Sequence, residues 1–173
     1  MQKIKNRWVR AMGTTLLAVV LTVAAGVFTM QAKAAASLAE CPVCQKTVEW
    51  TVFDGKQAIT VADGHAHIYL AYDVTETISE EAIIRVSGEK DADKNQLTYG
   101  SVCFNLNGHT LTVDNGYLWL DNDCKDYAST LNIIGTNGGE IRYTGAEIVR
   151  QNYGILNIYG GTYTPLDGGA FAT

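Results

Sequence analysis

The chain has 173 residues, 47% of them hydrophobic, and a net charge of −5. Residues 1–34 contain five of the 13 basic residues and none of the 18 acidic ones, so the other 139 residues hold 8 basic against 18 acidic side chains, a net charge of −10. This charge excludes nucleic acid and anionic lipid as partners, because phosphate binding needs clustered Lys and Arg. A chain of this length forms one domain of ordinary size rather than two.

Residues 1–34 have the pattern of a secretory signal peptide. Four basic residues within the first ten precede an apolar run at 13–30, and Ala32 and Ala34 stand where a signal peptidase requires small residues. A retained membrane anchor is the alternative, because the run approaches the roughly 20 residues that span a bilayer. We favour cleavage, since the small residues follow at the right distance. The protein is therefore predicted to be secreted, at the cell surface, with no membrane span after signal cleavage.

The rest of the chain is predicted to be all-β. Residues 35–64 form an entry segment with the sequence CPVC at 41–44 and an alternating stretch at 47–52. Residues 65–173 contain short runs rich in Ile, Val, Leu, Tyr and Thr, separated by Gly, Asn and Asp, as expected of half-buried strands. The predicted strands cover 67–70, 82–86, 102–113, 117–120, 131–134 and 155–159. Helical periodicity is absent.

An internal repeat points to the architecture. The segments 104–108 (FNLNG), 131–135 (LNIIG) and 156–160 (LNIYG) share the pattern apolar, Asn, aliphatic, any residue, Gly, and their glycines lie 27 and 25 residues apart. Recurrence at this spacing is typical of a solenoid, in which each repeat is one turn that cannot bury its apolar face alone. We therefore predict a parallel β-helix, in preference to a leucine-rich repeat or an antiparallel sandwich.

Stacking of the three segments would align their matching residues. Side chains alternate between the two faces of a strand, so the apolar positions point inward and the Asn positions outward. Phe104, Leu131 and Leu156 would then form one interior column, and Leu106, Ile133 and Ile158 a second. Outside, Asn105, Asn132 and Asn157 would form an amide ladder with a spacing of about 4.8 Å.

The stretch 41–173 resembles the pectin-lyase-like, right-handed parallel β-helix modules of Gram-positive bacterial surface proteins. The matching residues are the CPVC turn with Trp50, the segment GHAHIYL at 64–70, the segment VCFNLNGHTLT at 102–112, and the later LNI-x-G units. The resemblance implies a right-handed β-helix and a surface or secreted setting, and it does not imply lyase activity. Because residues 167–173 look like the opening of another coil, we expect the helix to be incomplete at the C-terminus, as in a fragment or a truncated gene product.

Four cysteines, Cys41, Cys44, Cys103 and Cys124, leave three interpretations open. Two disulfides are the first, because the chain is predicted to be exported. A structural zinc site is the second, with Cys41 and Cys44 joined by Cys103, by Cys124 or by the histidines His65 and His67. A thioredoxin-like redox pair is the third, although no α/β context surrounds the C-x-x-C.

Two further groups are candidate metal ligands. His65 and His67 alternate along a predicted strand and so share a face, as two ligands would. We favour partly exposed polar residues over a metal site there, because no carboxylate lies two or four positions away. The acidic turn at 121–126 (DNDCKD) is a candidate calcium site, although such clusters more often mark a solvated bend. The candidate cofactors are thus structural zinc or calcium.

No catalytic constellation is complete in this sequence. The enzymes of the resembled fold use clustered Asp residues, or calcium-binding acids beside Arg or Lys, whereas only Arg142 and Arg150 lie among the coils here. We therefore predict no catalytic residue and a structural or adhesive module that contacts an extracellular glycan or a host or cell-wall surface, with exposed Tyr residues as candidate sugar contacts. The alternative is the N-terminal part of a polysaccharide lyase or glycoside hydrolase whose catalytic coils lie beyond residue 173.

Overall fold

The described part of the chain is all-β, as predicted. The computed structural model describes residues 37–78, 82–88, 93, 98–121 and 129–172, and the predicted signal peptide lies outside these residues. Strands occupy most of the described residues and no helix occurs among them. Consequently, none of the described residues belongs to a helix that is long and apolar enough to cross a membrane.

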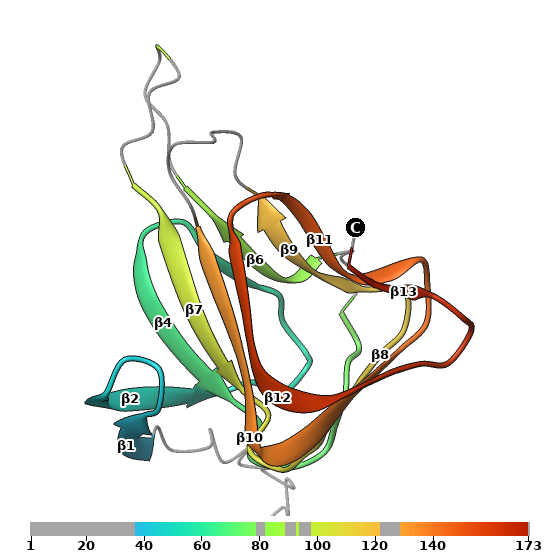
Figure 1. Ribbon diagram of the computed structural model, residues 1–173, viewed down its shortest axis with the longest axis horizontal. Helices are drawn as coiled ribbons and strands as arrows, with labels where there is room; N and C mark the ends of the chain where they lie inside the picture. Colours follow the sequence, from blue (N-terminus) through green and yellow to red (C-terminus); the bar gives the residue numbers. More distant parts are fainter. Residues whose placement is uncertain (1–36, 79–81, 89–92, 94–97, 122–128, 173) are drawn as a thin grey trace, which may run out of the picture. The chain divides into compact units, whose positions relative to one another are not determined.

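The larger sheet is built from two columns of parallel strands (Figure 1). In the first column, each strand pairs with the next. The order is β2 (Lys46–Val52), β4 (Gly64–Tyr69), β7 (Gly100–Asn105), the first half of β10 (Thr130–Tyr143) and the first half of β12 (Ile155–Pro165). The second column contains β5 (Val74–Thr75), β8 (Thr110–Val113) and the second halves of β10 and β12. β1 (Ser37–Cys41) is antiparallel to β2.

The smaller sheet forms a third column of parallel strands. Its members follow in chain order, namely β3 (Ile59–Val61), β6 (Ala82–Ser87), β9 (Tyr117–Asp121), β11 (Glu147–Tyr153) and β13 (Ala170–Ala172). The chain thus returns repeatedly to lie parallel beside a strand that it formed earlier. The antiparallel sandwich is excluded, because the β1–β2 hairpin is the one antiparallel pair among the described strands.

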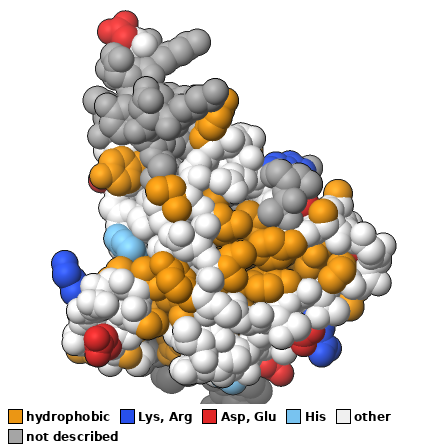
Figure 2. Space-filling view, viewed as in Figure 1, with side chains coloured by type: hydrophobic (Ala, Val, Ile, Leu, Met, Phe, Trp, Pro, Cys, Tyr) orange, Lys and Arg blue, Asp and Glu red, His pale blue; other side chains and the backbone are white. Residues whose placement is uncertain are grey.

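The core lies between the columns and consists of the inward side chains of successive strands. Ile68, Phe104 and Ile133 are in register on β4, β7 and β10, and all three are buried. Phe104 packs edge-on against Phe53, with ring centroids 6.0 Å apart. Figure 2 shows apolar side chains gathered on the face bordered by β12. Ile158 of β12, which pairs with the buried Ile133, is exposed.

The predicted entry segment does not form a separate body. Residues Lys33–Thr173 make one compact unit, in which residues 35–64 contribute β1, β2 and β3 to the two sheets. The hairpin β1–β2 continues the first column beyond β4.

The register corrects the predicted stacking. The second and third repeats pair as expected, with Asn132 opposite Asn157 and Gly135 opposite Gly160, and the Asn157 amide donates to Asn132 Oδ1 at 2.9 Å. The first repeat is displaced by two residues. Asn132 lies opposite Cys103, so Asn105 is outside the ladder. The interior columns change in the same way, because Phe104 rather than Leu106 lies opposite Ile133.

Turn chemistry explains the displacement. Asn105 Oδ1 accepts a hydrogen bond from the Asn107 backbone N–H at 2.8 Å, and Asn107 has φ 51°. Asn in this role starts a tight turn, so the strand ends at Asn105. The second-column pairing of Thr110 with Glu140 then places the Asn107-Gly108 turn over Asn137-Gly138. Gly108 and Gly138 have φ 81° and 84°. The structural equivalent of Gly108 is therefore Gly138, the glycine of the next Asn-Gly dipeptide, and not Gly135, the glycine of the shared pattern.

Gly135 is required by a close approach, not by a positive φ. A Cβ atom at this position would lie 2.5 Å from the backbone nitrogen of Gly161. We expect Gly135→Ala to lower the free energy of unfolding by about 1–3 kcal/mol, the usual cost of overpacking, as measured by denaturant unfolding. Gly138→Asn is the control, since a Cβ atom at Gly138 would meet no atom within 4 Å and Asn tolerates its left-handed conformation. Equal stability of both variants would contradict this prediction.

Candidate metal centre

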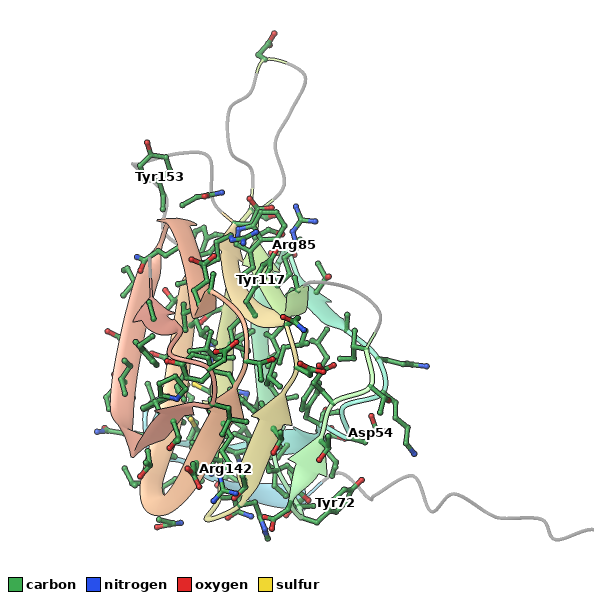
Figure 3. The ribbon with its side chains drawn as sticks, turned by 90° about the vertical axis from the view of Figure 1, so that its right-hand side faces the viewer. Asp54, Tyr72, Arg85, Tyr117, Arg142 and Tyr153 are labelled. Atoms are coloured by element: carbon green, nitrogen blue, oxygen red, sulfur yellow. The ribbon has the colours of Figure 1, made fainter. Side chains whose placement is uncertain are left out.

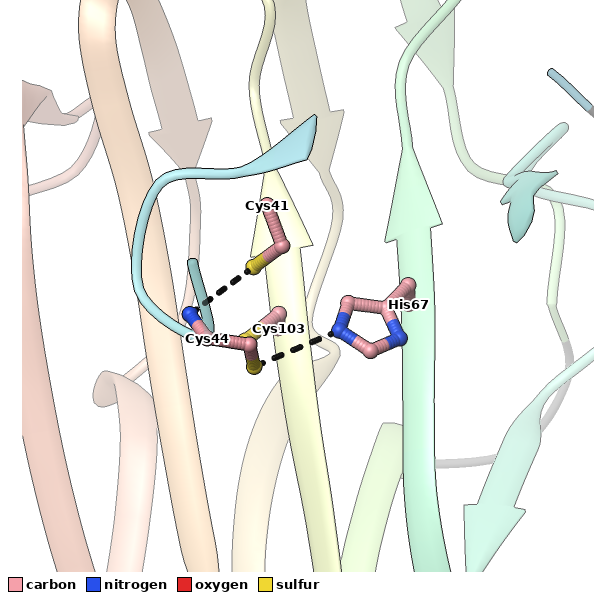
Figure 4. Close-up of side chains that lie close together, drawn as sticks. All are labelled: Cys41, Cys44, His67 and Cys103. Atoms are coloured by element: carbon pink, nitrogen blue, oxygen red, sulfur yellow. Dashed lines mark hydrogen bonds between the residues drawn. The ribbon is translucent and has the colours of Figure 1, made fainter. Parts of the chain in front are cut away.

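A tight turn presents two thiols on one side of the β1–β2 hairpin. Cys41 pairs with Lys46 across the hairpin, and the Gln45 backbone N–H donates to the Cys41 carbonyl at 2.8 Å, with Gln45 in a left-handed conformation at φ 55°. The Cys44 backbone N–H donates to Cys41 Sγ at 3.5 Å. Local backbone bonding thus holds both sulfur atoms toward the sheet below (Figure 4).

The neighbouring strands β4 and β7 supply the other donors. Cys103 points away from the core that Val102 and Phe104 enter, and it lies directly opposite His67 in the β4–β7 register. It is nevertheless completely buried, because it packs in a second apolar cluster with Cys41, Trp50 and Ile134. The hairpin therefore covers the outer face of the sheet at this point.

Four donor atoms converge with the spacing of a tetrahedral zinc site. The sulfur atoms of Cys41, Cys44 and Cys103 and one ring nitrogen of His67 all lie within 4.8 Å of one another. Cys44 Sγ is 3.4 Å from His67 Nε2 and 3.9 Å from Cys103 Sγ. Zinc bonds of about 2.3 Å to sulfur and about 2.05 Å to nitrogen would place tetrahedral ligands about 3.8 Å (S to S) and about 3.6 Å (S to N) apart. The donor set and its size therefore fit zinc.

His65 is a fifth donor beside this group. Its Nε2 lies 3.2 Å from Cys103 Sγ and 3.6 Å from Cys44 Sγ. The ring stacks on His67, with centroids 4.4 Å apart and planes 19° apart. Because a structural zinc ion takes four ligands, the two imidazoles are alternatives for one position. His67 is the better placed, since its nitrogen also lies near Cys41 and His65 is more exposed.

Residues around the donors hold two of them in place. The buried Asn132 amide donates to the Val102 carbonyl at 3.3 Å and contacts Cys103 Sγ at 3.6 Å, so it supports a negative charge on that sulfur. Trp50 packs edge-on against His67, with ring centroids 5.2 Å apart, and its Nε1–H donates to the Ala39 carbonyl at 3.3 Å. Supporting contacts of this kind orient metal ligands in known sites.

Burial favours the uncharged form of every donor whose pKa it shifts. It raises the pKa of the Cys44 and Cys103 thiols, and the hydrogen bond with Cys41 adds to the shift at Cys44. Burial lowers the pKa of His65 and His67. Neutral imidazole is the form that binds a metal, whereas buried thiols need a cation to become thiolates.

Zinc binding is therefore expected to release protons. Thiols held protonated by burial lose their protons to the solution when the metal binds, while the neutral imidazole loses none. We expect release of about two to three protons per zinc at pH 7, and an affinity that falls as the pH falls. Isothermal titration calorimetry in buffers of different ionisation enthalpy measures the number. A heat of binding independent of the buffer would contradict the expected release.

The structure brings together cysteines and histidines that the structural-zinc interpretation of the sequence considered as ligands. Cys41, Cys44 and Cys103 are free thiols in one cluster with His65 and His67, whereas Cys124 lies outside the described residues. The reason given against a histidine site, the lack of a nearby carboxylate, does not apply, because thiols from the hairpin and β7 complete the group. The C-x-x-C, the H-x-H and a later Cys suggested these ligands, but the sequence left open which of them meet.

Among the described residues, the other candidates do not form a second site. Of the predicted calcium turn, only Asp121 lies within the described residues, and its carboxylate pairs with Arg85. Arg142 pairs with Glu140 at 2.9 Å on β10. Arg150 pairs with Glu147 at 2.5 Å and also contacts Tyr117. Figure 3 shows Arg142 well apart from Tyr117, so the two arginines do not share a cluster.

The comparisons with known proteins add no assignment to this geometry. The chain matches no protein-family model, no curated protein and no solved structure.

Proposed function

We propose that this chain is an exported, non-catalytic module with a right-handed parallel β-helix, in which a structural zinc ion fastens the N-terminal hairpin to the first coils. The observation behind the proposal is the convergence of three sulfur atoms and one imidazole nitrogen within 4.8 Å. The zinc ligands are Cys41, Cys44, Cys103 and His67, with His65 as an alternative to His67. The module serves a structural or adhesive role at the cell surface.

The strand order supports the solenoid part of the proposal. Three columns of parallel strands, each visited in turn, are what a β-helix requires. Five successive passes can be followed, from β2 and β3 to β12 and β13. A right-handed path follows from the handedness that parallel crossover connections almost always have.

The chemistry of the donors favours a structural ion over a catalytic one. Structural zinc sites have four protein ligands, usually Cys with His, whereas catalytic sites keep one position open for water. Here three thiols and an imidazole complete the coordination, and Cys41 and Cys103 are completely buried. No position remains for a substrate.

Apart from the apolar cluster around Trp50, the hairpin is attached to the sheet by a short ladder. Its ladder with β4 contains two residue pairs, Thr51 with Ile68 and Val52 with Tyr69. A ladder this short holds a two-stranded hairpin weakly in water. Ligands donated from both sides, Cys41 and Cys44 from the hairpin and His67 and Cys103 from the sheet, would make the attachment firm.

Zinc content tests the metal centre. The full chain, purified without reductant or chelator, is expected to contain about one zinc ion, and Cys44→Ser is expected to contain close to none. Cys124→Ser leaves the five converging donors intact and is the matched control. Recovery of metal-free protein with a Cys41–Cys44 disulfide would overturn the proposal in favour of the disulfide interpretation, as would full zinc content in Cys44→Ser.

Export and the absence of catalysis have separate tests. Expression in a Gram-positive host should give a protein in the medium or on the cell surface whose first residue is Ala35. A protein that retains residues 1–34 would instead support the membrane-anchor alternative.

Incubation with plant and bacterial polysaccharides should release neither reducing nor unsaturated ends, and release of either would support the enzyme alternative.

A further inference from the structure

A hollow lies where the hairpin meets the corner between the first two strand columns. Its volume is about 370 Å³, within the range of small-molecule sites. The hairpin forms one wall with Glu40, Pro42 and Trp50, and the opposite wall contains Tyr69, Asn107 and Asn137 from the strand ends of three successive passes. The hollow is therefore closed only when the hairpin is in place.

The lining combines apolar rings with polar groups that have no partner among the described residues. Tyr69 is half-buried and packs edge-on against Trp50, with centroids 6.4 Å apart. Around the rings, the side chains of Glu40 and Asn137 are exposed and, within the described part of the chain, make no hydrogen bond or ion pair. Aromatic carbon surface beside free carboxylate and amide groups suits a ligand with both C–H faces and hydroxyl groups.

The charge of the lining narrows the ligand class. Glu40 is the one charged residue that lines the hollow among the described residues, and no Lys or Arg does so. A carboxylate or phosphate ligand would meet like charge without a cation to bind it. The volume of the hollow admits one or two sugar rings. We propose that this hollow binds a neutral saccharide, one or two pyranose units of an extracellular glycan.

Saccharide binding is then coupled to the metal without contact between the two. Pro42 lies between the ligands Cys41 and Cys44 and also lines the hollow. Trp50 touches His67 on one side and Tyr69 on the other. This coupling rests on the proposed zinc site, because the ion holds the wall that Pro42 and Trp50 form. Removal of zinc is expected to abolish saccharide binding.

The test titrates zinc-loaded full chain with neutral disaccharides (cellobiose, maltose, mannobiose and galactobiose) and with digalacturonate as the anionic probe. At least one neutral disaccharide should bind, and digalacturonate should bind more weakly. Tyr69→Ala and Asn137→Ala should each weaken binding by about tenfold or more, the loss of one good contact. Tyr72→Ala, which removes an exposed Tyr outside the hollow, should leave the affinity unchanged.

Zinc content measured on the same samples separates the two proposals. All three variants should retain about one zinc ion, since none removes a ligand. Binding of no neutral disaccharide by zinc-loaded protein, tighter binding of digalacturonate, or equal affinity in all variants would overturn the saccharide site while leaving the metal centre intact. Saccharide binding that survives in zinc-free Cys44→Ser would overturn the coupling alone.

Discussion

Removal of zinc with a chelator is expected to open the hairpin β1–β2 while the rest of the sheet stays folded. Hydrogen exchange of the amides at 46–52 should accelerate by about 100-fold or more, equivalent to about 2.7 kcal/mol of local stability. The physical reason is that only two ladder pairs with β4 and the apolar contacts around Trp50 remain once the ligands separate. Mass spectrometry of exchanged peptides measures the effect.

The control for this experiment is the peptide that covers residues 130–135. These residues pair on both sides, with β7 and with β12, so their exchange should change by less than about threefold on chelation. Re-addition of zinc should restore slow exchange in the hairpin. Equal acceleration in both peptides would show that the ion stabilises the whole fold, and no acceleration in either would show that it does not hold the hairpin.

Phe104→Ala is expected to have the largest effect on global stability, a loss of about 3–5 kcal/mol in the free energy of unfolding. Phe104 is completely buried, packs against Phe53, and lies between Ile68 and Ile133 in the interior column. Truncation leaves a cavity that neighbouring strands cannot close without breaking their ladders. Denaturant unfolding measures the loss.

The adjacent residue provides a matched contrast. Cys103 lies on the same strand as Phe104 but faces the hairpin. Cys103→Ser should therefore lose zinc and expose the hairpin amides to exchange, and it should lower the free energy of unfolding less than Phe104→Ala does. Phe104→Ala that still folds should retain its zinc. If the two variants show the same pattern of losses, the metal centre and the core are not energetically separate.

Much of the secondary structure could be predicted from residue patterns. Alternating residues at 102–104 and 131–133 indicated strands with one buried face, and the structure confirms the strands. Their second face is also buried, since Cys103 and Asn132 lie under the hairpin and beside it. Parallel pairing of the repeats at 131–135 and 156–160 followed from their identical pattern. Such predictions succeed because side-chain alternation and turn residues act over short distances.

The register and the metal centre depend on longer distances. A displacement of two residues preserves which side chains face inward, so the pattern around Phe104 could not distinguish the two alignments. The Asn105 turn decided between them. In the same way, Cys44 and Cys103 are 59 residues apart in the chain, and no local pattern indicates that the hairpin would cover that face of β7.

The amino-acid sequence by itself determined an all-β chain with parallel repeats, because alternation and Asn or Gly turns are local properties. The tertiary structure alone decided that Cys41, Cys44, His67 and Cys103 meet. Their meeting requires a hairpin folded back over the outer face of a sheet, and that position is set by packing of Trp50 and Ile134 between elements distant in sequence.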